Sequence, residues 1–101
     1  MAEITKDQIA EWKKQHGQIF KITPIEGLDV IYRPLKREDY IGIMNGQMSG
    51  EIVDPEIDTV KTCVLNDIPD IVYQEKGGLA TVVYEEIMKK SGFVIVESEE
   101  L

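Results

Sequence analysis

Residues 5–32 read TKDQIAEWKKQHGQIFKITPIEGLDVIY, and this stretch decides the fold. Thr5, followed three residues later by Gln8, forms a capping-box pattern that satisfies backbone donors where a helix begins. The pattern predicts a helix from Thr5 to His16. Gly17 comes next, and glycine readily takes the left-handed conformation that ends many helices.

The predicted first helix has one apolar face. Ile9, Trp12, Lys13 and His16 recur at the spacing of a single helical stripe, with polar residues opposite them. Trp12 is the only tryptophan of the chain. Because a large aromatic side chain on such a face usually packs, we expect Trp12 to be a core anchor against the segment that follows.

A β-hairpin is predicted after this helix. Gln18–Ile22 and Asp29–Arg33 are rich in β-branched and aromatic residues, and Thr23–Leu28 between them contains the proline and glycine typical of a connection. A hairpin alone is marginal in water. We therefore expect it to pack against a helix or to join another sheet.

The middle of the chain is expected to combine helices with a flexible loop. After Pro34 the apolar positions take helical spacing, which predicts a second helix over Arg37–Asn45. Three glycines then favour a mobile loop over Gly42–Gly50, the expected internal hinge. Asp54-Pro55 is a strong helix start, and this third helix should end near Asn66.

The last third of the chain begins with a short turn or helix over Asp70–Lys76, followed by a helix over Leu79–Lys90 with a wide apolar arc. Val82 falls on the polar side of this helix, and Tyr84 and Met88 lie at the edges of its arc. We expect these three side chains to belong to a subunit contact.

The chain ends in an apolar segment followed by an acidic one. Phe93–Val96 has strand chemistry and is an optional further strand for an edge of the hairpin, whereas residues 97–101 are predicted to form an acidic flexible end. The sequence thus predicts a small, mostly helical α+β domain over residues 1–96, with one hairpin near the N-terminus.

Composition limits the function. The 101 residues include 11 Lys+Arg and 19 Asp+Glu, and the net charge of -8 argues against binding to nucleic acid or to an anionic membrane. No signal-peptide core and no bilayer-length apolar run is present, which predicts a cytosolic, soluble protein. The single cysteine, Cys63, excludes an intrachain disulfide and is consistent with a reducing compartment.

No catalytic, cofactor-binding or metal-binding set emerges. The acids from Asp54 to Asp58 alternate as in a calcium loop, but Thr59 and Leu65 stand where that loop needs glycine and glutamate, so helix capping explains them better. His16 and Cys63 are alone of their types, and helix-dipole and core-packing roles account for them. One histidine and one cysteine leave only carboxylates as further metal ligands.

One compact basic cluster stands out in this acidic chain. It consists of Arg33, Lys36 and Arg37, followed by Glu38, Asp39 and Tyr40. One interpretation is a solvated strand end neutralised by the two acids. The other is a docking patch for an acidic partner segment, formed by Arg33, Lys36, Arg37 and Tyr40.

Short motifs follow one another in a definite order. They are IAEWKKQHG at residues 9–17, Tyr32-Arg33-Pro34, Arg37-Glu38-Asp39-Tyr40, Asp54-Pro55 before a helix with Cys63-Val64-Leu65, and Gly78-Leu79 before a helix closed by Gly92-Phe93. This order covers nearly the whole chain and resembles the tail assembly chaperones of long-tailed phages and prophage-like elements. The Gly42–Gly50 segment departs from the longer acidic or hydrophobic stretch of many members, so partner contacts are not carried over to it.

The resemblance implies a non-enzymatic protein of the host cytoplasm. Such a chaperone binds the phage tape-measure protein, helps tail-tube protein to polymerise around it, and does not stay in the finished particle. Association into a homo-oligomer is a further expectation. Two alternatives remain open: a structural subunit of a phage particle (neck, capsid or tail component), and a small enzyme using Cys63 or the acids near Asp54.

Overall fold

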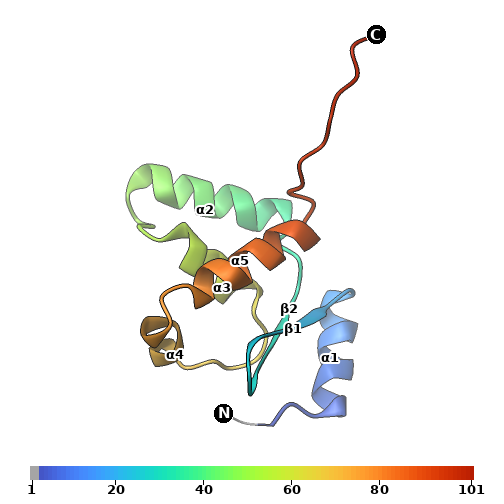
Figure 1. Ribbon diagram of the computed structural model, residues 1–101, viewed down its shortest axis with the longest axis vertical. Helices are drawn as coiled ribbons and strands as arrows, with labels where there is room; N and C mark the ends of the chain where they lie inside the picture. The colour runs from blue at the N-terminus through green and yellow to red at the C-terminus, as the bar shows by residue number, and fades with distance from the viewer. Residues whose placement is uncertain (1–2) are drawn as a thin grey trace.

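The chain folds into five helices and one β-hairpin in the computed structural model, which describes residues 3–101 (Figure 1). The elements in chain order are α1 (Lys6–His16), β1 (Phe20–Ile25), β2 (Leu28–Tyr32), α2 (Arg37–Ser49), α3 (Pro55–Cys63), α4 (Asp70–Glu75) and α5 (Leu79–Lys90). This arrangement confirms the predicted fold class, a small and mostly helical α+β single domain with one hairpin near the N-terminus.

The predicted helix starts are confirmed by their caps. The Thr5 hydroxyl accepts a hydrogen bond from the Gln8 N–H at 3.1 Å. The Asp54 carboxylate accepts one from the Ile57 N–H at 3.2 Å. Each cap satisfies an N–H that has no partner inside its own helix. The bounds of α5 agree with the predicted ones, and α4 is the short helix expected over Asp70–Lys76.

The hairpin is longer than predicted. β1 continues through Pro24 to Ile25, and the turn is reduced to two residues, with Gly27 at φ +83°. The antiparallel register is irregular between Ile22 and Ile25. A strand can hold a proline at such an irregularity because the missing N–H removes no ladder bond there. The predicted connection over Thr23–Leu28 was therefore too long.

The outer edge of β2 is closed by the segment that follows α3. The Leu65 N–H donates to the Ile31 carbonyl at 2.8 Å, and the Arg33 N–H donates to the Cys63 carbonyl at 3.0 Å. The Asn66 side chain accepts from the Ile31 N–H at 2.8 Å. These bonds explain why α3 ends at Cys63 and not near Asn66 as predicted, because the chain after it must extend to pair with β2.

The core lies between one face of the hairpin and the two helices α3 and α5. It contains fully buried side chains from each of these elements, Val30, Tyr32, Val60, Cys63, Val83 and Ile87. The Thr81 hydroxyl of α5 donates to the Glu56 carboxylate of α3 at 2.8 Å and ties the helix pair together. Burial of apolar area on this scale supplies most of the driving force for folding.

α2 runs through the glycines that were expected to form a mobile loop. The helix continues to Ser49 and ends at Gly50, where φ is +84°. Gly46 faces the segment after the helix: its carbonyl accepts from the Ile52 N–H at 3.0 Å, and a Cβ added to it would lie 2.5 Å from the Ile52 Cδ1. The hinge prediction was wrong, because this glycine serves a close contact and not flexibility.

Trp12 is not the core anchor that was expected. It is half-buried and lies outside the core cluster, and α1 has no fully buried residue. The core occupies the opposite face of the hairpin, whereas α1 covers the face that carries Ile31. Ile9 and Lys13 of α1 line a cavity of about 220 Å³ together with Ile31, so the contact is a loose one.

The optional C-terminal strand is absent from the part of the chain that the structure describes. Gly92 has φ +92° where α5 ends, and Phe93–Val96 then has no secondary structure and no partner strand. In Figure 1 this segment runs away from the body of the molecule. Residues 97–101 are exposed as well. Across residues 3–101, none of the helices combines the length and apolarity that crossing a membrane requires.

Candidate partner-binding surfaces

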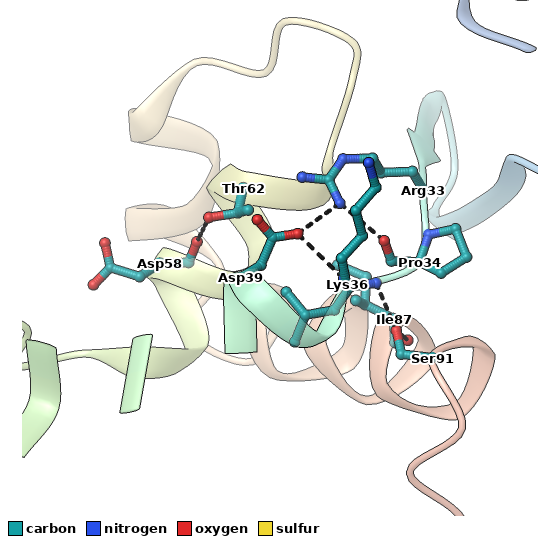
Figure 2. A network of polar contacts seen from close by, with 9 residues as sticks. Arg33, Pro34, Lys36, Asp39, Asp58, Thr62, Ile87 and Ser91 are labelled. Carbon is teal, nitrogen blue, oxygen red and sulfur yellow. Dashed lines mark hydrogen bonds and ion pairs between the residues drawn. The ribbon is translucent and has the colours of Figure 1, made fainter. Parts of the chain in front are cut away.

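The basic cluster divides into one half-buried and two exposed members. The Arg33 guanidinium donates to the Asp39 carboxylate at 2.9 Å and to the Pro34 carbonyl at 3.0 Å, as Figure 2 shows. The same carboxylate accepts from the Lys36 N–H at 3.2 Å and thereby caps the start of α2. Arg33 has only 13% of its side chain exposed, so its charge is used to position α2. Lys36 and Arg37 are exposed.

A second set of bonds joins the start of α2 to the end of α5. The Leu35 N–H donates to the Ser91 hydroxyl at 2.8 Å, and this hydroxyl donates in turn to the Ile87 carbonyl (Figure 2). Buried backbone groups outside helices and sheets need partners of this kind. The junction between β2 and α2 is therefore held in one position against α5.

The exposed members of the cluster lie beside two aromatic rings that contact each other at a tilt of 45°. The rings of Tyr40 and Phe93 have their centroids 4.9 Å apart, and the Arg37 guanidinium lies 5.4 Å from the centroid of Tyr40. We call Lys36, Arg37, Tyr40 and Phe93 the basic-aromatic surface. It borders an open cavity of about 280 Å³ that Leu35 also lines. Of the predicted docking patch, Lys36, Arg37 and Tyr40 belong to this surface.

The three residues expected in a subunit contact do not form one patch. Tyr84 and Met88 are half-buried and pack against the core. Burial, together with the nearby Glu56 and Tyr40, raises the pKa of the Tyr84 hydroxyl. Val82 is 47% exposed and lies apart from them. Of the three, only Val82 is exposed enough to contact another molecule.

Val82 lines a groove that the sequence did not reveal. The groove has a volume of about 410 Å³ and lies between the turn end of β1 and the start of α5. Its apolar walls are Pro24, Ile25, Leu79 and Val82, and Gly77 and Gly78 form part of its floor. We call it the hairpin–α5 groove. From the sequence, Ile25 was expected in the connecting loop because Pro24 precedes it. An apolar residue directly before a tight turn is, however, typical of the end of a strand.

The charges at the hairpin–α5 groove are mainly negative. Glu75 and Lys76 line it directly, Glu26 follows the lining residue Ile25 in the turn, and Glu85 is one helical turn beyond Val82. Within residues 3–101, none of these three carboxylates takes part in an ion pair. An apolar groove with free negative charges at its border is suited to an apolar helix face flanked by lysine or arginine.

The residues weighed for chemistry have structural roles. Cys63 is fully buried, and this burial raises the pKa of its thiol from 9.0 to about 11, which keeps it protonated and unreactive. Asp54 caps α3, which confirms the capping interpretation. Among the described residues, no three His, Cys, Asp or Glu side chains gather in a way that could hold a metal ion. No protein-family model, curated protein or solved structure matches this chain.

Proposed function

We propose that this protein is a non-enzymatic tail assembly chaperone of a long-tailed phage or prophage-like element. It binds the tape-measure protein in the host cytoplasm and assists polymerisation of the tail-tube protein around it. The observation that carries the proposal is the hairpin–α5 groove, an apolar depression with Ile25 and Val82 in its walls and, apart from Lys76, acidic side chains at its border. The order of motifs along the chain supports the same function.

The physical demands of the task agree with this surface. A tape-measure protein is a long helical chain whose apolar stripes would aggregate before a tube encloses them. A groove of about 410 Å³ accepts a few side chains of one helical stripe, which favours weak and reversible binding over a permanent complex. Reversibility is required, because the tube protein must later displace the chaperone.

Charge supports both binding and dispersal. The carboxylates of Glu26, Glu75 and Glu85 would attract basic residues beside the apolar stripe of the partner. The net charge of -8 would keep several copies on one partner apart from other complexes. The acidic excess thus has a function in addition to excluding nucleic acid.

Co-expression with the tape-measure protein of the same genetic element tests the proposal. The wild-type chain should co-purify with it, and Val82→Glu should reduce the amount retained roughly tenfold by placing a charge in the apolar wall. Val53→Glu is the matched control, because Val53 is 91% exposed and lies outside the groove. Absence of wild-type binding would refute the function, and equal retention of both variants would refute the site.

Mass spectrometry of purified particles separates the chaperone from the structural-subunit alternative. A chaperone should be absent or scarce in finished particles, since it leaves when the tube closes. A fixed copy number per particle would replace the proposed function by that of a neck, capsid or tail component.

A further inference from the structure

We infer that two copies of this chain associate by exchanging their C-terminal segments, each Phe93–Val96 adding as a third strand to the free edge of β1 in the other copy. The inference concerns self-association and is independent of the tape-measure protein. It rests on the open edge of one strand, on an exposed segment with strand chemistry, and on the charges beside each of them.

The edge of β1 is the open edge of the hairpin. Ile31 of β2 directs both its N–H and its C=O to the segment after α3, where they bond to Asn66 and Leu65. Ile31 is paired with Lys21 of β1. In an antiparallel ladder, the two residues of a non-hydrogen-bonded pair both direct their backbone N–H and C=O groups away from the partner strand. Lys21 therefore directs its N–H and C=O away from β2. Within residues 3–101 nothing bonds to these two groups.

The segment that fits this edge is the apolar end of the chain. The exposed fractions of Phe93, Val94, Ile95 and Val96 are 42%, 58%, 101% and 77%. A run of β-branched and aromatic residues favours a β-strand, and proteins normally cover such a run when it would otherwise be exposed. Strand addition satisfies the backbone of the donor and of the acceptor at once.

The segment does not serve the β1 edge of its own chain. Phe93 is held on α2 by its contact with the Tyr40 ring, and its N–H donates to the Met88 carbonyl at 3.0 Å. These contacts direct Val94 and the residues after it away from the body, as Figure 1 shows. A second copy can receive the segment beyond Phe93 while these contacts stay in place, and the bond that pairing would replace is that of the Val94 N–H to the Gly92 carbonyl at 3.0 Å.

Charge complementarity favours a second copy as the occupant. Glu97, Glu99 and Glu100 follow the apolar segment directly. Beside β1 lie the exposed Lys21 and the exposed Lys13 of α1, which line one cavity with Ile31. This face is basic in a chain that is acidic overall, and the acidic end would meet it. Because each copy has one donor and one acceptor, exchange between two copies closes with twofold symmetry.

Sedimentation velocity of the full chain over a range of concentrations tests the inference. The wild type should form a dimer whose population rises with concentration and falls with added salt. Ile95→Pro, which disables the donor, and Lys21→Pro, which disables the acceptor, should each weaken dimerisation by roughly tenfold or more. Val53→Asp, at an exposed valine outside both elements, should leave it unchanged.

Mixing the two proline variants gives the sharpest result. Ile95→Pro retains an intact edge and Lys21→Pro retains an intact segment, so the mixture should form a one-to-one heterodimer held by a single exchanged strand. Circular dichroism and thermal melting of each variant should show the wild-type fold, so that a loss of dimer reports on the exchanged strand. A monomeric wild type, or variants that dimerise as the wild type does, would overturn the inference, as would a mixture in which no heterodimer forms.

Discussion

Replacing Gly42 or Gly46 by alanine should affect stability in different ways, although both glycines lie inside α2 with ordinary helical backbone angles. Alanine is favoured over glycine in a helix interior by about 1 kcal/mol. At Gly42 an added Cβ has no heavy atom within 4 Å, so Gly42→Ala should stabilise the protein by about that amount. In a domain of this size, about 1 kcal/mol raises Tm by about 4–8 °C.

At Gly46 the same gain is opposed by a steric clash. The added Cβ would lie 2.5 Å from the Ile52 Cδ1 and 2.7 Å from its Cγ1, so the Ile52 side chain must move. Overpacking of this kind costs about 1–3 kcal/mol, which equals or exceeds the helix gain. Gly46→Ala should therefore be about 1–3 kcal/mol less stable than Gly42→Ala.

Urea unfolding followed by far-UV circular dichroism measures both variants. The double variant Gly46→Ala with Ile52→Ala completes the comparison, because removal of the larger side chain should abolish the penalty at Gly46. Equal stabilisation by both alanines would refute the proposed contact with Ile52. Destabilisation by Gly42→Ala would refute the helix itself and return this stretch to the loop that its composition favours.

Three further predictions concern buried polar groups. The Tyr32 hydroxyl is buried without a hydrogen-bond partner within residues 3–101. Tyr32→Phe should therefore leave the free energy of unfolding unchanged or raise it by up to about 1 kcal/mol. A decrease of more than about 1 kcal/mol would show that the hydroxyl does have a hydrogen-bond partner. Burial raises the pKa of the Cys63 thiol from 9.0 to about 11, so its contribution to stability should fall by roughly 2–3 kcal/mol as pH rises through this window. Cys63→Ala should make the alkaline loss of stability smaller, although tyrosines whose pKa values are also raised by burial keep part of it. Asn66→Ala removes two hydrogen bonds to the β2 backbone and should cost about 1–3 kcal/mol in chemical denaturation, whereas Asn45→Ala, at an exposed position of α2, should change stability little.

The sequence predicts best where one local interaction decides the structure. The cap at Thr5, the Asp54-Pro55 start and the apolar arc of α5 each specify an element by themselves, and all three are confirmed. The hairpin was also correctly predicted, because β-branched and aromatic residues flank a turn. In these cases propensity, capping and hydrophobic period agree with the tertiary structure.

Prediction from sequence failed where a distant residue decides. The end of α3 depends on bonds to a strand more than thirty residues earlier. The role of Gly46 depends on a residue six positions later, Ile52, whose return onto the helix is not indicated by the composition of this stretch. The hairpin–α5 groove could not be predicted, because it joins Ile25 to Val82 from opposite ends of the chain. One interpretation of the sequence was that Asp39 neutralises the basic cluster, and Asp39 does pair with Arg33. That the same Asp39 carboxylate also caps α2 became evident only from the three-dimensional structure.

β1 links the two proposed surfaces, because its outer edge receives the exchanged strand and its turn end forms a wall of the hairpin–α5 groove. Lys21 and Ile25 are four positions apart, which corresponds to about 13 Å along a strand, so a strand on the edge leaves room for a partner in the groove. β2 cannot accept a further strand, because Asn66 and its neighbours already close that edge. Strand exchange would therefore satisfy the remaining open edge of the hairpin and restrain β1, and Ile25 with it, so that the dimer is the form whose groove is best ordered for a partner.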